Sequence, residues 1–317
     1  MERIVEISIV IPLYNEEKVF DKLILRLIRL LDSSPTIIEI VLVDDGSTDE
    51  TPLHMHAIAF KDDRFKAVFL SRNYGHQTAL SAGMAHVSAS KAVMIIDGDL
   101  QDPPEMVTPF YEKISDGYDV VYAIREKRQE NFLKRFLYWG FYRILKVISD
   151  VNLPLDSGDF CMMTRKVNDI IVSMPEQSRF VRGLRTWVGF KQIGVAYERD
   201  KRADGVSKYP MAKLFQLAFD GIFSFSFIPL RVITRLGFFT ILGSMLYLSY
   251  VLFKKFFGYP LPSGFTALIF SLSLFSGVQL ISLGILGEYI SRIYVQVKNR
   301  PLYLVKKVIK NKQEENG

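Results

Sequence analysis

Asp97 and Asp99 are separated by one glycine, and Gln101 follows two residues later. Their types and spacing suit the binding of a divalent cation, because carboxylate and amide oxygens are the hard ligands that Mg²⁺ or Mn²⁺ prefers. The phosphates of a nucleotide can complete such a coordination shell. A D-x-D pair is also common in solvated loops, so its meaning depends on the elements that position it.

Strands and helices are predicted to alternate around these residues. Short apolar runs predict strands over residues 7–13, 39–43, 66–70, 92–96 and 119–123, and apolar positions at helical spacing predict helices over residues 16–31, 48–60 and 77–88. This alternation indicates an α/β fold with a mostly parallel sheet, in which ligands bind at the carboxyl ends of strands. Glu16, Asp44 and Asp97 each come just after a predicted strand. We therefore expect these side chains to share one edge of the sheet.

Composition and motifs exclude several other classes of protein. The sequence has neither G-x-G-x-x-G nor G-x-x-x-x-G-K-[ST], so a metal or Arg and Lys side chains must balance the charge of any bound phosphate. Cys161 is the only cysteine, which excludes a disulfide framework and a C-x-x-C zinc site. A hydrophobic fraction of 49% excludes a disordered chain.

The net charge of +6 comes entirely from the C-terminal part of the chain. Residues 231–317 contain 11 basic and 3 acidic residues, a balance of +8. The first 230 residues therefore hold 29 of the 40 basic and 31 of the 34 acidic residues, a balance of −2. A slightly acidic domain argues against nucleic acid as a partner.

Two uncharged stretches, residues 236–253 and 265–287, predict transmembrane helices. The alternative, a pair of buried helices in a soluble protein, does not explain two such runs without a charged face. Basic residues flank the pair on its outer sides, so the positive-inside rule places both ends of the chain in the cytoplasm. The acidic N-terminus lacks the features of a signal peptide. We expect a two-span membrane protein with a catalytic domain over residues 1–212 and a basic cytoplasmic tail over residues 291–317.

Two further segments suggest contact with the membrane surface. Residues 213–230 are rich in Phe and predict an interfacial amphipathic helix, although a core helix is an alternative. Arg179, Arg182 and Arg185 recur at helical spacing. This spacing suits a face that meets anionic head groups, and a solvated basic face explains it about as well.

Several motifs resemble the family 2 glycosyltransferases of GT-A fold in order and spacing. They are IVIPLYNEE (9–17), VDDGSTD (43–49), SRNYGHQTALSAGM (71–84) and DGDLQDPPE (97–105). Later motifs resemble the polyprenyl-phosphate glycosyltransferases: SGDFCMMTR (157–165), RFVRGLRTWVGF (179–190), RADGVSKYP (202–210), DGIFSFSFIPL (220–230) and GVQLISLGILGEYISRIYVQVKNRPLY (277–303). Among these, the sequence looks like the two-span bactoprenol glucosyltransferase type, which is related to dolichol-phosphate mannose synthase.

The resemblance implies roles for individual residues. Pro12, Tyr14 and Glu16 resemble positions that hold the base and ribose of the donor, and Asp45 or its neighbour Asp44 the position that reads the base. Asp97, Asp99 and Gln101 resemble the set around the metal and the donor diphosphate. Arg125 resembles the arginine that meets the acceptor phosphate, and Asp159 the candidate catalytic carboxylate. Arg202 and Lys208 match a loop that closes over the diphosphate. From the residues alone, Asp159 could instead be the N-cap of a helix, and Arg202 and Lys208 could lie in a solvated loop.

The reaction implied is inverting transfer of a hexose from a nucleotide sugar to polyprenyl phosphate, with Mg²⁺ or Mn²⁺ as cofactor. UDP-glucose is the favoured donor, with UDP-galactose, UDP-GlcNAc and GDP-mannose as alternatives. Relatives suggest a homotetramer. A processive polymer synthase is a competing reading, but Arg185-Thr186-Trp187 does not form the Q-x-x-R-W motif of those enzymes. A catalytically silent membrane scaffold is another alternative. The argument against it is that the expected site residues are intact: Asp97, Asp99, Gln101, Asp159 and Lys208.

Overall fold

The computed structural model describes residues 4–125, 157–177, 179–197, 228–258 and 264–316. Its described strands form one nine-stranded sheet in the order β7-β5-β6-β4-β1-β2-β3-β8-β9. The strands are β1 (Ile7–Leu13), β2 (Ile38–Asp44), β3 (Phe65–Leu70), β4 (Ala92–Ile95), β5 (Val120–Arg125), β6 (Ser157–Thr164), β7 (Gln192–Tyr197), β8 (Val305–Lys310) and β9 (Gln313–Asn316).

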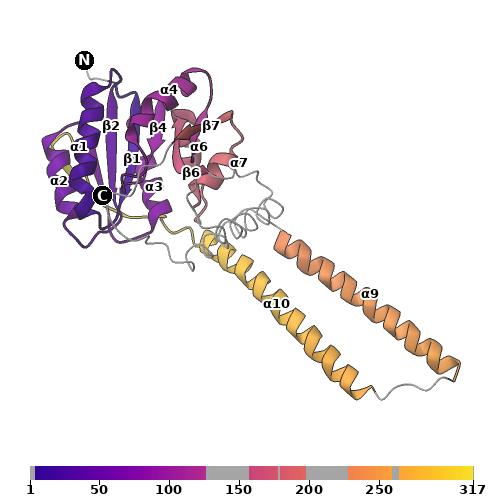
Figure 1. The fold of residues 1–317 in the computed structure, drawn as a ribbon. Helices are drawn as coiled ribbons and strands as arrows, with labels where there is room; N and C mark the ends of the chain where they lie inside the picture. Colours follow the sequence, from indigo (N-terminus) through magenta and orange to yellow (C-terminus); the bar gives the residue numbers. More distant parts are fainter. Residues whose placement is uncertain (1–3, 126–156, 178, 198–227, 259–263, 317) are drawn as a thin grey trace.

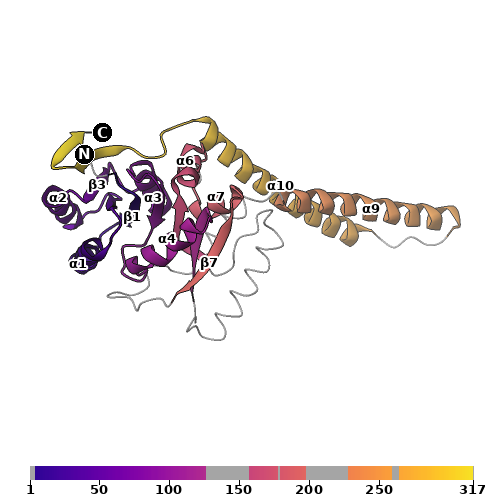
Figure 2. The same ribbon diagram turned by 90° about the horizontal axis from the view of Figure 1, so that it is seen from above.

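Helices cover both faces of this sheet (Figures 1 and 2). They are α1 (Glu17–Ser33), α2 (Thr51–Lys61), α3 (His76–Ala85), the short η1 (Pro104–Met106), α4 (Val107–Ser115), α6 (Arg165–Ser173) and α7 (Val181–Trp187). Two longer helices, α9 (Ile228–Phe256) and α10 (Phe265–Val297), lie outside the sheet.

The alternation of side chains along each strand sorts the helices into two layers. Ile9 and Ile11 of β1 belong to a buried cluster with α1, α2 and α4, whereas Val10 belongs to a second cluster with α3, α6 and α7. Successive strand residues point to opposite faces of a sheet, so a strand buried on both faces is apolar throughout. This explains why the short apolar runs in the sequence predicted β1 to β4.

The sheet is mixed rather than mostly parallel. The strands β4, β1, β2 and β3 are parallel to one another, as expected from the alternating pattern. The strand β6 pairs antiparallel with both β4 and β5, and β8 pairs antiparallel with β3. The predicted α/β fold is confirmed, with antiparallel strands added on both sides of its parallel centre.

The last part of the segment expected as a basic cytoplasmic tail, residues 291–317, joins the sheet. The strand β8 lies along β3 in the sheet, with Ile309 opposite Ala67, and Ile309 is fully buried. The strand β9 then pairs with β8. In β8, Ile309 is buried, Val305 and Val308 are partly buried, and Lys306 and Lys310 are exposed, a composition that suits a protected strand near a sheet edge. Those lysines resemble a cytoplasmic flank when the sequence is considered alone.

The helices α9 and α10 project from one end of the α/β domain (Figures 1 and 2). Both are long and apolar enough to cross a membrane, over Ile228–Phe256 and Leu274–Val297. The 29 residues of α9 give a length of about 43 Å, more than the roughly 30 Å of a hydrocarbon core. The helices therefore extend beyond the predicted stretches 236–253 and 265–287.

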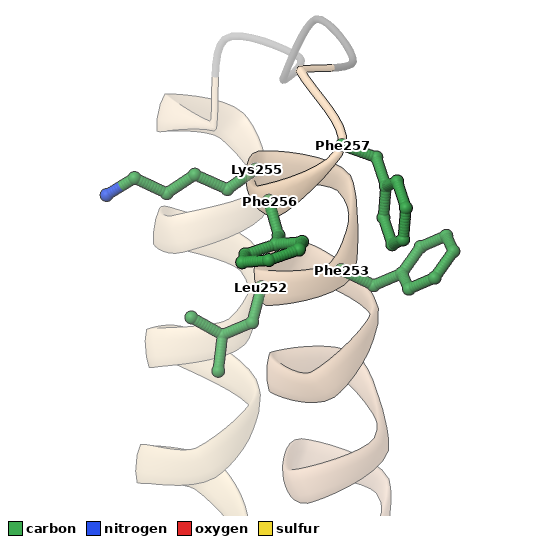
Figure 3. A pocket seen from close by; sticks show the side chains of 5 residues that line it. All are labelled: Leu252, Phe253, Lys255, Phe256 and Phe257. Carbon is green, nitrogen blue, oxygen red and sulfur yellow. The ribbon is translucent and has the colours of Figure 1, made fainter.

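The end of α9 carries an apolar hollow lined by Leu252, Phe253, Lys255, Phe256 and Phe257. Figure 3 shows the Lys255 side chain pointing away from the two phenylalanines at 253 and 257. Aromatic rings beside a lysine are typical of the boundary between lipid and water. This composition suits a helix end at the surface of a bilayer.

The other end of the hairpin is joined to the α/β domain by side-chain hydrogen bonds. Gln296 of α10 accepts from the Gln177 backbone N–H at 3.0 Å and donates to the Pro175 carbonyl at 2.7 Å. The Gln177 side chain in turn donates to the Arg300 carbonyl at 2.9 Å. These bonds connect α10 to the segment that runs from α6 to α7.

Both interpretations of the arginine-rich segment 179–187 are wrong for two of its three arginines. Arg179 donates to the carbonyls of Ile171 and Met174 at 2.8 and 2.6 Å, which caps the C-terminal end of α6. Arg185 is fully buried, with its guanidinium carbon 5.2 Å from the centre of the Tyr122 ring. Of the expected interfacial segment 213–230, residues 213–227 lie outside the described residues, and α9 begins at Ile228.

Candidate active site

The loops that follow β1 and β2 are joined at the carboxyl edge of the sheet. Asn15 has a φ of 54°, and its backbone N–H donates to the Ser47 hydroxyl at 3.0 Å. The Asn15 side-chain oxygen accepts from the Thr48 N–H at 2.8 Å, and the Glu16 N–H donates to the Thr51 hydroxyl at 3.0 Å. These bonds hold Tyr14, whose side chain is exposed, and Glu16 at one end of the edge.

Asp44 and Asp45 are buried and shape the loops around them. Asp44 accepts from the Ser47 N–H at 3.0 Å. The two oxygens of Asp45 accept from the N–H groups of Tyr74 and Gly75 at 2.8 and 3.0 Å. Burial raises the pKa of both carboxyls, and these backbone hydrogen bonds oppose that rise. Asp45 thereby fixes the start of α3 against the end of β2.

The D-x-D loop follows β4 and lies against β1. A Cβ atom on Gly98 would come 2.4 Å from Leu13 Cδ2 and 3.2 Å from the Pro12 carbonyl oxygen, so only glycine fits there. Asp97 and Asp99 on either side remain partly exposed. Asp99 accepts from the Gln101 N–H at 3.1 Å, which closes a tight turn.

Asp159 lies beside Asp97 because of the register between β4 and β6. Ile95 is opposite Cys161 in this antiparallel pair, so two further steps align Asp97 with Asp159. Asp159 belongs to β6, and the helix that follows is capped by the Thr164 hydroxyl, which accepts from the Val167 N–H at 3.4 Å. The alternative role of Asp159 as a helix N-cap is therefore wrong.

His76, the first residue of α3, stands between these two carboxylates. Its Nε2 atom is 3.5 Å from Asp97 Oδ1 and 3.7 Å from Asp159 Oδ2. Burial lowers the pKa of His76, but the hydrogen bond to Asp159 and the charges of Asp97, Asp159 and Asp45 raise it to about 9. The imidazole is therefore a cation in the absence of ligands. His76 belongs to the motif at residues 71–84, but the sequence alone indicates no role for it.

The Asp159 carboxylate is held by groups from α3 and α7. Gln77 donates to Asp159 Oδ2 at 2.7 Å. Burial would raise the pKa of Asp159, but the hydrogen bond and charge of His76, the charge of Arg182 and the Gln77 hydrogen bond lower it to about 2. Asp159 is therefore an anion at neutral pH. Sequence reasoning missed Gln77 as well, because its partner lies 82 residues away.

A buried hydrogen bond joins the D-x-D loop to the end of β7. The Tyr197 hydroxyl donates to Asp102 Oδ1 at 2.9 Å, and both side chains are buried. Tyr197 is the last described residue before the segment 198–227, which contains Arg202 and Lys208. Those two predicted residues lie outside the described part of the chain. Arg125 ends β5 opposite Tyr197, and thus shares this edge of the sheet through its backbone position.

The carboxylates of the D-x-D loop fit a divalent cation that is also held by a bound ligand. Within the described ranges, no three His, Cys, Asp or Glu side chains form a group that could hold a metal ion by themselves. Asp97 and Asp99 offer partly exposed carboxylate oxygens at the open edge of the sheet. Mg²⁺ is usually bound by one or two carboxylates together with substrate phosphates. The acidic pair matches this mode of binding.

Comparisons with known proteins agree with this architecture. The family model "Glycosyl transferase family 2" matches residues 8–171. The chain is 43% identical over 308 residues to "Uncharacterized glycosyltransferase YkcC" of Bacillus subtilis (strain 168), which covers 97% of this chain and 95% of the relative. It is 40% identical over 304 residues to "Bactoprenol glucosyl transferase" of Shigella phage SfII, which covers 95% of this chain and 98% of the relative.

A similar solved structure is glucosyl-3-phosphoglycerate synthase from Mycobacterium tuberculosis in complex with Mn²⁺, UDP and phosphoglyceric acid. The two share 21% identity and a TM-score of 0.45, over 69% of this chain and 76% of the synthase. The likeness to the two curated relatives extends over nearly the whole chain. With its mixed α/β sheet of the GT-A type, this chain is a glycosyltransferase and belongs to glycosyl transferase family 2.

Proposed function

We propose that this enzyme transfers glucose from UDP-glucose to a polyprenyl phosphate such as undecaprenyl phosphate. The product is a lipid-linked sugar for glycosylation of the cell envelope. The observation that carries the proposal is the meeting of Asp97 and Asp159 around His76, 3.5 and 3.7 Å from its Nε2 atom, in a domain joined to two apolar helices. A relative named for bactoprenol glucosyl transfer, 40% identical over 304 residues, supports the choice of sugar and acceptor.

The donor occupies the carboxyl edge of β1, β2 and β4 in this proposal. Pro12, Tyr14 and Glu16 hold the base and ribose, and Asp44 and Asp45 read the base edge or shape the loop against which it lies. Asp97, Asp99 and Gln101 face the diphosphate. A divalent metal bound there would balance the negative charge that grows on the departing diphosphate. Arg202 and Lys208 contribute further positive charge to the same group.

The acceptor approaches from the membrane, since its isoprenoid chain stays in the bilayer. Arg125 meets its phosphate. The helices α9 and α10 cross the membrane, with the catalytic domain and the C-terminus on the cytoplasmic side, as the basic flanks of the pair indicate. Residues 213–230 lie at the same surface, and the enzyme assembles as a homo-oligomer, a tetramer by resemblance.

The chemistry is a single displacement with inversion at the anomeric carbon. A phosphate monoester has its second pKa near 6, so the acceptor is largely a dianion at neutral pH and needs little help from a base. Asp159 remains ionised in this site and orients the sugar or positions Arg125. His76 balances the charge of Asp159 and Asp97 before ligands bind. Preorganised charges of this kind stabilise a transition state without further rearrangement.

Membranes that contain the full-length enzyme can test this function directly. With radiolabelled UDP-glucose and undecaprenyl phosphate, we expect an organic-soluble labelled product with inverted anomeric configuration. Excess chelator is expected to abolish its formation, and added Mg²⁺ or Mn²⁺ to restore it. UDP-galactose, UDP-GlcNAc and GDP-mannose serve as competing donors. Absence of product with all four donors would refute the function, and full activity in chelator would refute the metal assignment alone.

A further inference from the structure

Gln77 connects Asp159 to the backbone of α7 by two side-chain hydrogen bonds, one of 2.7 Å and one of 2.8 Å. Its Nε2 atom donates to Asp159 Oδ2, and its Oε1 atom accepts from the Val181 N–H. A backbone N–H can only donate, which fixes the orientation of the amide. The nitrogen must therefore face Asp159.

From this geometry we infer that Gln77 is a positioning residue for the transfer reaction. It holds one oxygen of Asp159, so that the other oxygen of this carboxylate is presented to the bound substrates in one orientation. The inference rests on the proposed function, because it assigns to Gln77 an action through Asp159. Gln77 itself needs no contact with substrate in this role.

The support behind Gln77 is itself rigid. Asp45 holds the N–H groups of Tyr74 and Gly75, the residues just before α3. Gly75 has a φ of 94°, a left-handed conformation that favours glycine. The first turn of α3 is thus fixed by the buried carboxylate of Asp45, which directly follows β2, and Gln77 lies in that turn. A side chain that orients a reacting group is effective only when its own support is fixed.

Two substitutions separate the positioning of Asp159 from the anchoring of α7. Gln77→Glu keeps an oxygen that accepts from the Val181 N–H and replaces the donor to Asp159 with a repelling carboxylate. Gln77→Met has a similar length and removes both bonds. If Gln77 positions Asp159, both variants lose about 10- to 100-fold in kcat with little change in the KM for the donor, the range expected for a misplaced reacting group. Gln313→Glu makes the same change on the exposed strand β9 and keeps the activity of the natural enzyme.

The outcomes are distinguishable in the full-length enzyme. Full kcat in Gln77→Glu with loss in Gln77→Met means that Gln77 only anchors α7, and overturns the inference. Full kcat in both variants overturns it too. If the natural enzyme makes no lipid-linked sugar, the proposed function fails first and this inference falls with it.

A reciprocal exchange tests the hydrogen bond independently of turnover. In the double variant Gln77→Glu/Asp159→Asn the glutamate accepts and the asparagine donates, so the bond re-forms with its direction reversed. We expect thermal unfolding of the double variant to return towards the natural value from that of Gln77→Glu, whereas kcat stays low because the carboxylate at position 159 is gone. An unfolding temperature no higher than that of Gln77→Glu would show that the two residues are not coupled, and would overturn the inference.

Discussion

Asp159 is surrounded at the residue scale by groups that keep it ionised, and its substitution by asparagine removes that charge with almost no change in shape. Because Asp159 orients the sugar or positions Arg125 in the proposed site, we expect Asp159→Asn to lower kcat by about 100-fold, the cost of a misplaced reacting group. Donor binding should remain, since the donor is held by other loops. Steady-state kinetics and donor binding by calorimetry check both parts, and a fully active Asp159→Asn enzyme would remove Asp159 from the mechanism.

Gly98 offers a test of the D-x-D loop without touching either carboxylate. A methyl group at this position would collide with Leu13 Cδ2 at 2.4 Å, so the loop or β1 must move. We expect Gly98→Ala to reduce the free energy of unfolding by about 1–3 kcal/mol, the usual cost of overpacking, and to weaken donor binding. In Gly243→Ala the new methyl group meets nothing within 4 Å, so neither the free energy of unfolding nor the donor affinity should fall. Unchanged donor affinity in Gly98→Ala would contradict the placement of the donor beside this loop.

The residues that surround Asp159 differ in how far the sequence could predict them. Asp97 and Asp99 follow an apolar strand, and this local pattern is enough to place them at the edge of a sheet. His76 and Gln77 have no such local signal, because their contacts depend on how α3 packs against β6. That packing depends on the order of the strands in the sheet, which cannot be predicted reliably from a single sequence.

At the scale of elements, a buried ion pair joins the first strands at the edge opposite the site. Glu39 of β2 lies 2.8 Å from the Lys66 ammonium of β3, and both side chains are at most 7% exposed. Glu39 also accepts from the Ser8 hydroxyl of β1 at 2.7 Å and from the Ser88 N–H at 2.9 Å. One carboxylate thus ties three strands to the segment before β4.

Glu39→Gln would leave the Lys66 charge buried without its counterion. Breaking such a pair by removing one partner costs about 3–5 kcal/mol of stability, and we expect denaturant unfolding to show a loss of that size. Glu105→Gln is the matched control, because the Arg26–Glu105 pair is exposed on the surface. A surface pair contributes about 0–1 kcal/mol. Equal losses of stability in the two variants would contradict the prediction that the buried pair contributes more stability than the surface pair.

The same pair predicts how stability depends on pH. Burial would raise the pKa of Glu39, but the charge and hydrogen bond of Lys66 and the bonds from Ser8 and Ser88 lower it below 4.5. A carboxyl whose folded pKa is lowered contributes stability above its unfolded pKa and loses it as the pH falls through the folded pKa. Below pH 4.5, the free energy of unfolding of Glu39→Gln should therefore fall less with decreasing pH than that of the natural enzyme. Denaturant unfolding at a series of pH values measures this difference.

Most elements could be predicted from their own residues, and the exceptions have physical causes. The strands β1 to β4 are mostly apolar because they are buried on both faces. Arg185 at helical spacing resembled a surface residue, yet it is buried beside Tyr122. The strand β8 is short and rich in lysine, because one side of it is exposed near the sheet edge. In these cases the tertiary contacts of a residue decide whether it is buried, and its charge alone does not predict this.

At the scale of the whole molecule, hydrogen bonds join α10 to the α/β domain, and in the proposed function this joint orients the site relative to the membrane. Gln296 makes two hydrogen bonds across this joint, each worth about 1 kcal/mol. We expect Gln296→Leu to lower transfer to undecaprenyl phosphate in vesicles by about tenfold, the effect of about 1.4 kcal/mol. Transfer to a short water-soluble prenyl phosphate should be much less affected, because that acceptor needs no fixed membrane orientation.

Ser282→Ala is the control for this joint. The Ser282 hydroxyl bonds only its own helix in α10, to the Val278 carbonyl at 2.8 Å, so both acceptors should react as in the natural enzyme. Equal losses with the long and the short acceptor in Gln296→Leu would show that the joint affects the chemistry and not the orientation of the domain.

The return of the chain from α10 into the sheet as β8 also sets an order of assembly. During synthesis β8 leaves the ribosome only after the two apolar helices α9 and α10 have been made, whereas the strands β1 to β7 have emerged before them. Until then the outer side of β3 has no β8 partner. The sheet is thus completed last, after both apolar helices have been made, so that in the proposed membrane arrangement the finished enzyme assembles after these helices have entered the bilayer.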